Sequence, residues 1–570
     1  MPHPTFAKAR GIWVNRLLSL GFVAAFASQG YVQIVRSSLI LDRVSGSESK
    51  SVDFAERGLV LAADGSPLAQ QQDVFSMTVS FKNVPHSMGF FSDLSKASGI
   101  PASEFSQLLS LGVKGQTWQE PISAKQKEEI ENVRKNWGAG GITLTPVGTR
   151  VYPLGESTAG FLGMVKGQAP VCGLELGWNK ILAGKNGMTV GLKDRDGRFL
   201  PMRANERASQ SRMDGETITL TIDTDLQMAA TLAVKSAVEK NHAENGAAVV
   251  YDPKTGDILA MANWPSFDPN DVTGTGSRSK VRSDFNLNYM EPLEPGSTFK
   301  ILTLAKALDK GVLGPDEHVS CNLTMTISGK TFGCDKKHGA HGSVGPQDAI
   351  ARSCNIAAAN WALRIGREDF LQYIKDMGLL EKPGLGLPQE ARGLFDDTET
   401  AQKLQLALLG FGQPINCTPI ALASAFSTLA NNGLRMKPRL VKQIGTKEIK
   451  SQVAGQIIKS ETAQELLTCM EAVVESDRGT GKTLRIPGYR IGGKTGTAQK
   501  RNAATGSMKG GGYVSNFVGF VPADKPRAVI LVMINNPDKR IAYYGAAVAG
   551  PAFQDIAKAV IHKLQIPKSQ

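Results

Sequence analysis

Cysteine is scarce in this chain, with 6 residues in 570, and the sequence lacks long runs of Lys or Arg and any evident repeat period. Six cysteines are too few for a fold held together by disulfides. The formal net charge of +13 is spread thinly, and no motif that reads a nucleic-acid groove accompanies it. The charge therefore favours an anionic surface as a neighbour, and nucleic acid is not expected as a partner.

The composition fits neither a disordered chain nor a polytopic membrane protein. Hydrophobic residues make up 41% of the chain and charged residues 21%, which are ordinary values for a globular protein. A chain of 570 residues exceeds what one hydrophobic core supports, so it should hold two or three domains.

An uncharged segment lies near the N-terminus. Residues 17–35 carry no charge between Arg16 and Arg36, and as a helix they would reach ~28 Å, enough to span a bilayer. The basic residues before the segment place the short tail in the cytoplasm and the rest of the chain outside. A cleaved signal peptide is the alternative, since Ala25-Phe26-Ala27 resembles a cleavage site, but the apolar run continues past it. Both interpretations export the bulk of the chain.

Three short motifs follow one another in the C-terminal half. They are Ser297-Thr298-Phe299-Lys300, Ser353-Cys354-Asn355 and Lys494-Thr495-Gly496-Thr497. Each alone is a weak signal, because Ser47-Glu48-Ser49-Lys50 and Ser277-Arg278-Ser279-Lys280 also fit S-x-x-K, and Lys254-Thr255-Gly256 also fits K-T-G. In this order, the three together are typical of acyl-transfer enzymes with a serine nucleophile and a nearby lysine.

Local context separates the first motif from its spurious copies. Ser297 follows Pro295-Gly296 and opens an apolar run with helical spacing that reaches Leu308. Residues i and i+3 of a helix share a face, so Lys300 is expected within hydrogen-bond reach of the Ser297 hydroxyl. The alternative is that the motif residues are only helix caps, turns or the end of an edge strand. The ordered set of three motifs disfavours it.

The pattern around the motifs predicts an α+β fold. Helices are expected after Asp223 and over 551–564, with a long helical insert over about 297–480. Strands are expected over residues 217–222, 246–251, 258–262, 489–498, 513–521 and 528–534. This order predicts an antiparallel sheet flanked by helices, together with an all-helical lobe.

Two cysteines lie close together in the sequence. Cys321 and Cys334 could form a local disulfide in an oxidising compartment, or could stay unpaired. With His338 and His341 just after them they could also bind zinc, although the spacing lacks a C-x2–4-C knuckle. The local disulfide is the favoured interpretation, and all three stay open.

With these residues in place, the chain resembles the class B penicillin-binding proteins, the membrane-anchored D,D-transpeptidases that cross-link peptidoglycan. Further motifs of the family match Arg57-Gly58, Arg150-Val151-Tyr152-Pro153 and Gly173-Leu174-Glu175. Tyr543-Tyr544-Gly545 and Glu294-Pro295-Gly296 are similar to the cell-division branch. Two features depart from that pattern: Asn286-Leu287-Asn288 replaces the usual Asn-Arg-Ala, and Ser-Cys-Asn is more familiar from the elongation branch.

The resemblance implies a penicillin-binding transpeptidase fold preceded by an elongated pedestal domain and one transmembrane helix. The implied parts are a cytoplasmic tail over 1–16, a transmembrane anchor over 17–36, a linker over 37–52, a pedestal domain of the dimerisation type over 53–218 and a transpeptidase domain over 219–566.

The resemblance also implies a septal peptidoglycan D,D-transpeptidase that works through an acyl-enzyme on Ser297. Lys300 would be the general base, with its ordinary pKa of roughly 10.4 lowered by burial and by Lys494. Ser353 would relay the proton to the leaving amine, and Asn355 would hold the amide of the acyl donor. Neither a metal nor a cofactor is expected to take part.

The last motif would bind the substrate. Lys494, or Thr495 and Thr497, would hold the terminal carboxylate, and Gly496 would also belong to the substrate-binding strand. The backbone N–H groups of Ser297 and Thr497 would form the oxyanion hole. The partners implied are peptidoglycan stem peptides, β-lactams as covalent inhibitors, the bacterial cytoplasmic membrane, a polytopic septal glycan polymerase and other division proteins. The catalytic part would lie outside the cytoplasm, at the division septum.

Several alternatives share the same motifs. An elongation-type class B transpeptidase would use the same chemistry in a different complex. A D,D-carboxypeptidase or a β-lactamase would resolve the acyl-enzyme with water, although the anchor and the long pedestal count against a β-lactamase. A β-lactam sensor or a division scaffold without catalysis is the alternative from another class.

Overall fold

The computed structural model describes residues 4–35, 48–167, 169–193, 199–201, 210–271, 285–335, 339–395, 402–500 and 511–569. The chain forms two compact units, Met1–Glu56 with Ala183–Gly215 and Arg57–Leu182 with Glu216–Gln570. Most of the predicted linker over 37–52 lies outside the described residues.

The first unit holds the N-terminal helix and a small sheet. Helix α1 (Pro4–Gly30) continues into a π-helical turn, η1 (Tyr31–Val35). Three strands pair antiparallel: β1 (Glu48–Asp53), β8 (Gly187–Lys193) and β9 (Phe199–Pro201). Within the part of the chain that the structure describes, no helix combines the length and hydropathy needed to cross a membrane. The anchor over 17–36 stays a prediction.

The second unit begins with a sheet of seven strands. These are β2 (Val60–Leu61), β3 (Pro67–Ser80), β4 (Gly115–Ile122), β5 (Ile142–Val151), β10 (Ile218–Leu220), β20 (Val441–Ile444) and β21 (Lys447–Glu448). Their order is β21-β20-β10-β2-β3-β4, and β5 also pairs with β3. The sheet therefore joins strands from before residue 220 to strands from after residue 440.

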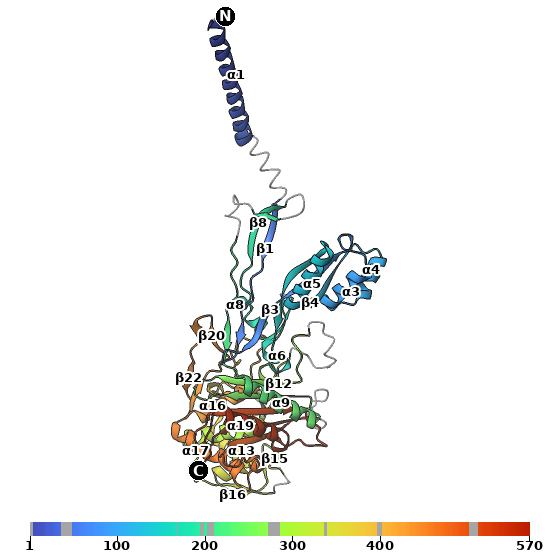
Figure 1. Ribbon diagram of the computed structural model, residues 1–570. Coiled ribbons are helices and arrows are strands. Elements are labelled where there is room, and N and C mark those ends of the chain that lie inside the picture. Colours follow the sequence, from blue (N-terminus) through green and yellow to red (C-terminus); the bar gives the residue numbers. More distant parts are fainter. Residues whose placement is uncertain are drawn as a thin grey trace. The chain divides into compact units, whose positions relative to one another are not determined.

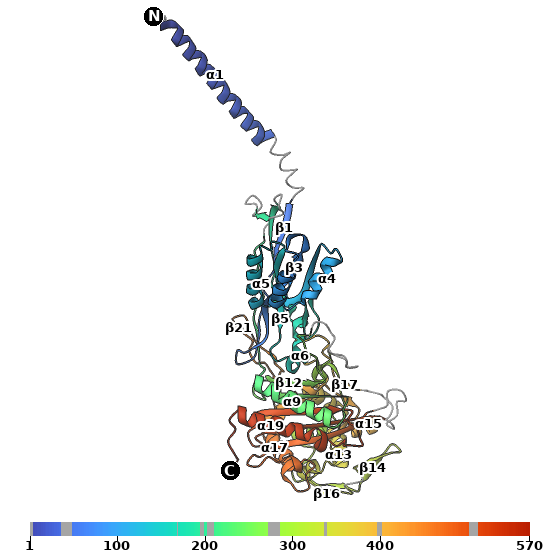
Figure 2. The same cartoon turned by 45° about the vertical axis from the view of Figure 1, so that its right-hand side comes forward.

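Helices α3 (Met88–Ser98), α4 (Ala102–Ser110) and α5 (Ala124–Trp137) pack in a core with β3 and β4 (Figure 2). The ends of α5 follow from its sequence. Ser123 accepts a hydrogen bond from the Gln126 N–H and forms a capping box with that residue. Gly138, at φ 60°, ends the helix in the left-handed conformation that favours glycine.

A buried ion cluster stabilises the start of this unit. Glu175 lies on the short helix α7 (Gly173–Gly177) and is fully buried. The Arg57 Nε donates to one of its carboxylate oxygens at 2.6 Å, and the Arg150 Nε to the other at 2.7 Å. Tyr152 lies beside the cluster and accepts a hydrogen bond from the Val165 N–H. The three motifs that contain Arg57, Arg150 and Glu175 therefore meet in the interior of this unit.

Glu175→Gln should destabilise the protein strongly, because it leaves two buried guanidinium groups without a countercharge. Breaking a buried ion pair in this way typically costs ~3–5 kcal/mol. The unfolding transition seen by calorimetry should fall by about 10 °C. Glu131→Gln, which removes the exposed Arg134–Glu131 pair, is the control and should cost at most ~1 kcal/mol. Equal transition temperatures for the two variants would contradict a stabilising role for the cluster.

A five-stranded antiparallel sheet forms the centre of the C-terminal part. Its strands are β11 (Asn245–Tyr251), β12 (Ile258–Trp264), β23 (Gly492–Gln499), β24 (Tyr513–Val521) and β25 (Ala528–Asn535). The order β12-β11-β25-β24-β23 makes β23 an edge strand. The strands predicted over 246–251 and 258–262 and the three predicted C-terminal strands are confirmed, although β23 begins at Gly492 rather than at residue 489.

Helices α9 (Thr224–Lys240) and α19 (Gly550–Lys563) lie side by side against this sheet (Figures 1 and 2). Asp223 begins α9 as predicted, because its carboxylate accepts from the N–H groups of Asp225 and Leu226. The apolar residues of both helices form one core with residues of the sheet that include Val250, Ile530 and Val532.

The insert between β12 and β23 is not all-helical, which corrects the prediction. Its helices are α10 (Leu287–Met290), α11 (Phe299–Asp309), α12 (Pro346–Ala351), α13 (Asn355–Ile365), α14 (Arg367–Asp376), α15 (Gln402–Leu409), α16 (Pro419–Ala430) and α17 (Ser460–Glu475). Short strand pairs join them: β13 (Val319–Cys321) with β16 (Gly342–Val344), β14 (Thr324–Ile327) with β15 (Lys330–Gly333), β17 (Leu394–Phe395) with β18 (Ile415–Asn416), and β19 (Leu434–Met436) with β22 (Val453–Gln456).

The hairpin β14–β15 shows why the prediction failed. Ser328 and Gly329, at φ 50° and 74°, form a two-residue connection with positive φ at both positions. Polar and apolar residues alternate along β14, but β14 and β15 have only four residues each. Such short strands carry little periodic signal inside a stretch dominated by helical spacing.

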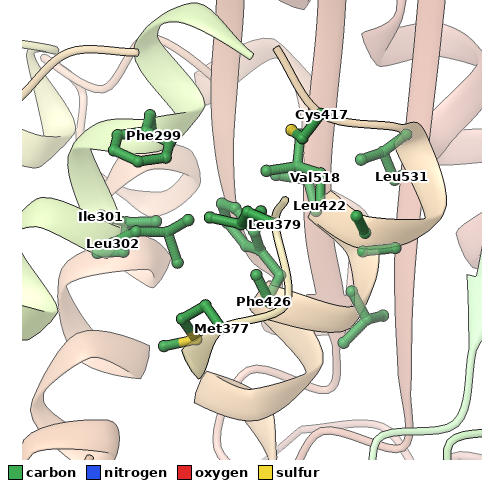
Figure 3. Close-up of a cluster of buried hydrophobic side chains, with 14 of the residues drawn as sticks. Phe299, Ile301, Leu302, Met377, Leu379, Cys417, Leu422, Phe426, Val518 and Leu531 are labelled. Carbon is green, nitrogen blue, oxygen red and sulfur yellow. The ribbon is translucent and has the colours of Figure 1, made fainter. Parts of the chain in front are cut away.

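The core of the insert fixes the helix that follows the first motif. Figure 3 shows Phe299, Ile301 and Leu302 of α11 in one buried cluster with Phe426 of α16 and Val518 of β24. Every residue of α16 is buried, which is consistent with its place between the sheet and the other helices. The helix α11 therefore has little freedom to move relative to the sheet.

Candidate active site

Ser297 lies in a tight turn against the edge strand. It belongs to a 3₁₀ turn, η4 (Gly296–Thr298), that leads directly into α11. Gly296 has φ +58°, and a Cβ added there would lie 3.2 Å from the Ala498 Cβ and 3.3 Å from the Thr497 carbonyl carbon. Glycine thus permits both the left-handed turn and the close approach of Ser297 to β23.

All three motifs meet at the Ser353 hydroxyl. The Lys300 Nζ donates to the Ser353 Oγ at 2.9 Å and to the Ser353 carbonyl at 2.6 Å. The Lys494 Nζ donates to the same Oγ at 3.0 Å. Residues from three distant parts of the sequence therefore converge on one oxygen atom.

The structure differs from the sequence-based expectation for Lys300. Among the described residues, its ammonium group donates to Ser353, and no hydrogen bond joins it to the Ser297 hydroxyl. Ser297 lies on the turn η4 and Lys300 three residues later, in the first turn of α11, which follows η4 directly. Hydrogen bonds to a nucleophile are often long or poorly aligned before substrate binds, so this difference does not exclude the predicted role.

Burial changes the protonation of both lysines. Lys300 is 1% exposed, and burial lowers its pKa to about 8, against a smaller opposing effect from Cys334 and Cys354. Lys494 is fully buried, and both burial and the nearby Lys300 hold its pKa well below the ordinary value. Because the two ammonium groups contact one hydroxyl, a single positive charge on the pair is favoured over two.

Backbone strain marks the Ser353-Cys354-Asn355 turn. Ser353 has φ +57°, an uncommon conformation for a residue other than glycine. Cys354 is the N-cap of α13, and its Sγ accepts a hydrogen bond from the Ala357 N–H at 3.4 Å. Asn355 is the first residue of that helix, and its Nδ2 donates to the Gly333 carbonyl at the end of β15 at 2.6 Å. The turn is thus tied to the hairpin β14–β15.

The last motif lies on the edge strand of the central sheet, and its residues are mostly buried. Lys494, Thr495, Gly496 and Thr497 lie in sequence on β23, and an added Cβ on Gly496 would lie 2.1 Å from the Asn516 Oδ1. The predicted site residues lie on η4, on α11, in the turn before α13, at the first position of α13 and on β23.

Two further residues contact this strand, and the motifs do not include them. The Thr495 hydroxyl is hydrogen-bonded to the Thr480 hydroxyl at 3.0 Å. The Gly545 N–H donates to the Thr497 Oγ1 at 3.0 Å. Thr480 carried no signal in the sequence, whereas Gly545 follows the tyrosine pair that resembles the cell-division branch.

The tyrosine pair connects strand β24 to the segment that follows β15. Tyr543 stacks on Tyr544 with ring centroids 4.4 Å apart, and it also contacts Tyr513 at 4.7 Å. The Tyr544 hydroxyl donates to the Asp335 carboxylate at 2.8 Å. Asp335 follows Cys334 directly, so aromatic and polar contacts link both sides of the site.

Among the described residues, the copy of the last motif lies in another part of the sheet. Lys254 belongs to the turn between β11 and β12, whereas Ser47 and Ser277 lie outside the described residues. The predicted disulfide is not formed, because the Cys321 and Cys334 sulfurs are 3.6 Å apart and neither residue takes part in a disulfide. A disulfide would need a separation of ~2.05 Å. His338 lies outside the described residues.

Two family models match the chain. The Penicillin-binding Protein dimerisation domain covers residues 52–220, and the Penicillin binding protein transpeptidase domain covers residues 246–558. The second match extends over more than half of the chain and includes all three motifs.

Curated relatives agree with these matches. The chain is 33% identical to Penicillin-binding protein PbpB of Mycolicibacterium smegmatis over 74% of its length and 66% of that protein. It is 31% identical to Stage V sporulation protein D of Bacillus subtilis, over 94% of the chain and 83% of that protein. It is 28% identical to Peptidoglycan D,D-transpeptidase FtsI of Escherichia coli, over 90% of the chain and 84% of that protein.

Penicillin binding protein 3 of Mycobacterium tuberculosis, solved in complex with aztreonam, is a structural neighbour. It is 25% identical, has a TM-score of 0.69, and the match covers 91% of this chain and 98% of the solved one. The domain pair, the three motifs and their convergence at Ser353 agree with these matches. The chain therefore belongs to the class B penicillin-binding proteins, the serine D,D-transpeptidases of peptidoglycan that β-lactams inhibit.

Proposed function

We propose that this chain cross-links peptidoglycan at the division septum through a Ser297 acyl-enzyme on the penultimate D-alanine of a stem peptide. The observation that carries the proposal is the convergence of Lys300 and Lys494 on the Ser353 hydroxyl, beside the turn that holds Ser297. A buried lysine pair with lowered pKa values can accept a proton at neutral pH, which an exposed lysine cannot do efficiently.

Proton transfer would begin at the lysine pair. A substrate carboxylate near β23 favours the positive charge on Lys494, which leaves Lys300 neutral and able to take the Ser297 proton. The Ser297 oxygen then attacks the carbonyl carbon of the D-Ala-D-Ala amide. Ser353, hydrogen-bonded to both lysines, gives its hydroxyl proton to the leaving D-alanine amine and takes up the proton that Lys300 holds.

Substrate binding would use the edge strand and the neighbouring turn. Asn355 holds the amide of the acyl donor, while Thr495 and Thr497 hold its carboxylate with Lys494. The backbone N–H groups of Ser297 and Thr497 stabilise the oxyanion, a contribution of roughly 3 kcal/mol per donor in other acyl-transfer enzymes. The close packing of Gly296 on Thr497 supports this pairing, because it brings the two peptide groups together.

The acyl-enzyme would be resolved by an amine of a second stem peptide. The test uses the full chain with a D-Ala-D-Ala donor peptide, with and without an amine acceptor, and separates the products by mass spectrometry. We expect a cross-linked product that depends on the acceptor, with release of D-alanine. A hydrolysed donor as the main product in both reactions would identify a D,D-carboxypeptidase instead.

We place the enzyme at the septum, anchored by residues 17–36 in the cytoplasmic membrane, with the pedestal over 53–218 and the transpeptidase domain over 219–566 outside. The similarity of Tyr543-Tyr544-Gly545 to the cell-division branch supports this, and a polytopic septal glycan polymerase is the proposed partner. Depletion should give filamentous or chained cells, with the tagged protein at the septum. Rounded cells and uniform sidewall labelling would assign it to the elongation branch.

A further inference from the structure

Four side chains that the proposed chemistry does not use meet behind the Ser353-Cys354-Asn355 turn. They are Cys321, Cys334, His341 and Cys354, all of them buried, and their ligand atoms lie within 4.8 Å of one another. They come from the end of β13, the residue after β15, the loop before β16 and the N-cap of α13. We propose that they bind one Zn²⁺ ion as a Cys3His site that holds this turn in place.

The distances fit a tetrahedral zinc centre. Sulfurs bound to one zinc at ~2.3 Å lie ~3.8 Å apart, and a sulfur and an imidazole nitrogen lie ~3.6 Å apart. The Cys334 sulfur is 3.6 Å from that of Cys321 and 3.8 Å from that of Cys354, and the Cys321 sulfur is 3.6 Å from the His341 Nδ1. Three thiolates and one imidazole are a donor set that suits zinc.

The surroundings of the sulfurs also favour thiolate ligands. The Asn355 N–H donates to the Cys334 sulfur at 3.3 Å, and the Ala357 N–H donates to the Cys354 sulfur at 3.4 Å. Both donors belong to the first turn of α13, whose dipole favours negative charge. Among the described residues, the His341 Nε2 is buried without a hydrogen-bond partner, so the ring is not committed to another polar group.

A bound zinc would affect the active site by holding the Ser353-Cys354-Asn355 turn in place. Cys354 lies between Ser353 and Asn355, and Cys334 follows Gly333, whose carbonyl accepts from the Asn355 side chain. The metal would clamp both ends of the hairpin β14–β15 to this turn and hold Ser353 at its unfavourable φ. Binding replaces the three thiol protons, which pass to solvent, and oxidises nothing.

The test measures the number of zinc ions per chain by inductively coupled plasma mass spectrometry. The full chain is purified without added metal and without a metal-affinity tag. We expect close to one zinc per wild-type chain and at least about a tenfold loss in Cys321→Ser and His341→Gln. The matched control is Cys469→Ser, because Cys469 is buried on α17 outside the cluster. It should keep the wild-type zinc content.

A second measurement does not depend on the folding of a variant. Cobalt exchanged into the wild-type protein should give thiolate charge-transfer bands and the visible bands of tetrahedral Co²⁺. Removing zinc from the wild-type protein with a thiol-reactive mercurial and then restoring thiols and zinc should lower and recover the acylation rate. Wild-type protein without zinc, a disulfide between any two of the three cysteines, or full zinc retention in Cys321→Ser would overturn the site.

Discussion

Replacement of Ser297 by alanine is expected to abolish covalent labelling by a β-lactam. The strained amide of the inhibitor mimics the D-Ala-D-Ala amide, and only a positioned hydroxyl beside the lysine pair can attack it. The acylation rate should fall to background, at least about 10⁴-fold below wild type. Intact-protein mass spectrometry after exposure to penicillin measures the adduct, and peptide mapping of the wild-type protein locates it.

The same variant should fold normally. Ser297 is only half-buried, and its hydroxyl makes no hydrogen bond among the described residues, so its removal leaves no buried polar group unpaired. The transition temperature should change by no more than about 2 °C. An adduct that maps to Ser47 or Ser277, or labelling that survives in Ser297→Ala, would assign the nucleophile elsewhere.

Replacement of Lys300 by methionine is the second large effect. Removing a general base typically slows proton transfer ~10²–10⁴-fold, which is about 3–5 kcal/mol in activation free energy. Methionine keeps most of the volume of the buried side chain and removes a charge that is costly to bury, so stability should be equal or higher. The rates of β-lactam acylation of the wild-type protein and of Lys300→Met are compared by rapid mixing, quenching and mass spectrometry.

The pH dependence identifies the role of Lys300. Because burial lowers its pKa to about 8, the neutral form that accepts a proton grows as the pH rises from 6 to 8 and is nearly complete above pH 9. The wild-type acylation rate should therefore rise with pH and level off above an apparent pKa near 8, which belongs to the lysine pair. Lys300→Met should lose this rise.

Two variants separate this role from general effects of charge. Lys306→Ala changes another lysine on the same helix, whose Nζ lies 5.6 Å from the Tyr373 ring, and should keep the wild-type rate and pH profile. Lys494→Ala should mainly weaken recognition of the substrate carboxylate. A wild-type rate in Lys300→Met would exclude it as the general base.

Much of the site could be predicted from local sequence because its parts are short and self-contained. A glycine before the serine permits the tight turn, and the spacing of three residues follows from the pitch of a helix. The strands on both sides of the insert could also be predicted, because alternating or continuous runs of apolar residues indicate strands with one or both faces buried. The short hairpins of the insert were missed because four residues are too few to establish a period.

The sequence alone predicted the nucleophile, its lysine neighbour and the α+β class, since each prediction depends on residues close together in the chain. Only the tertiary structure decided that Lys300 and Lys494 share the Ser353 hydroxyl and that Thr480 and Gly545 contact the edge strand. It also decided that Cys354 and His341 join Cys321 and Cys334 in one cluster. Such contacts depend on packing between distant segments. The spacing of residues within one segment does not predict whether two sulfur atoms lie at the distance of a disulfide or at the longer distance of a metal site.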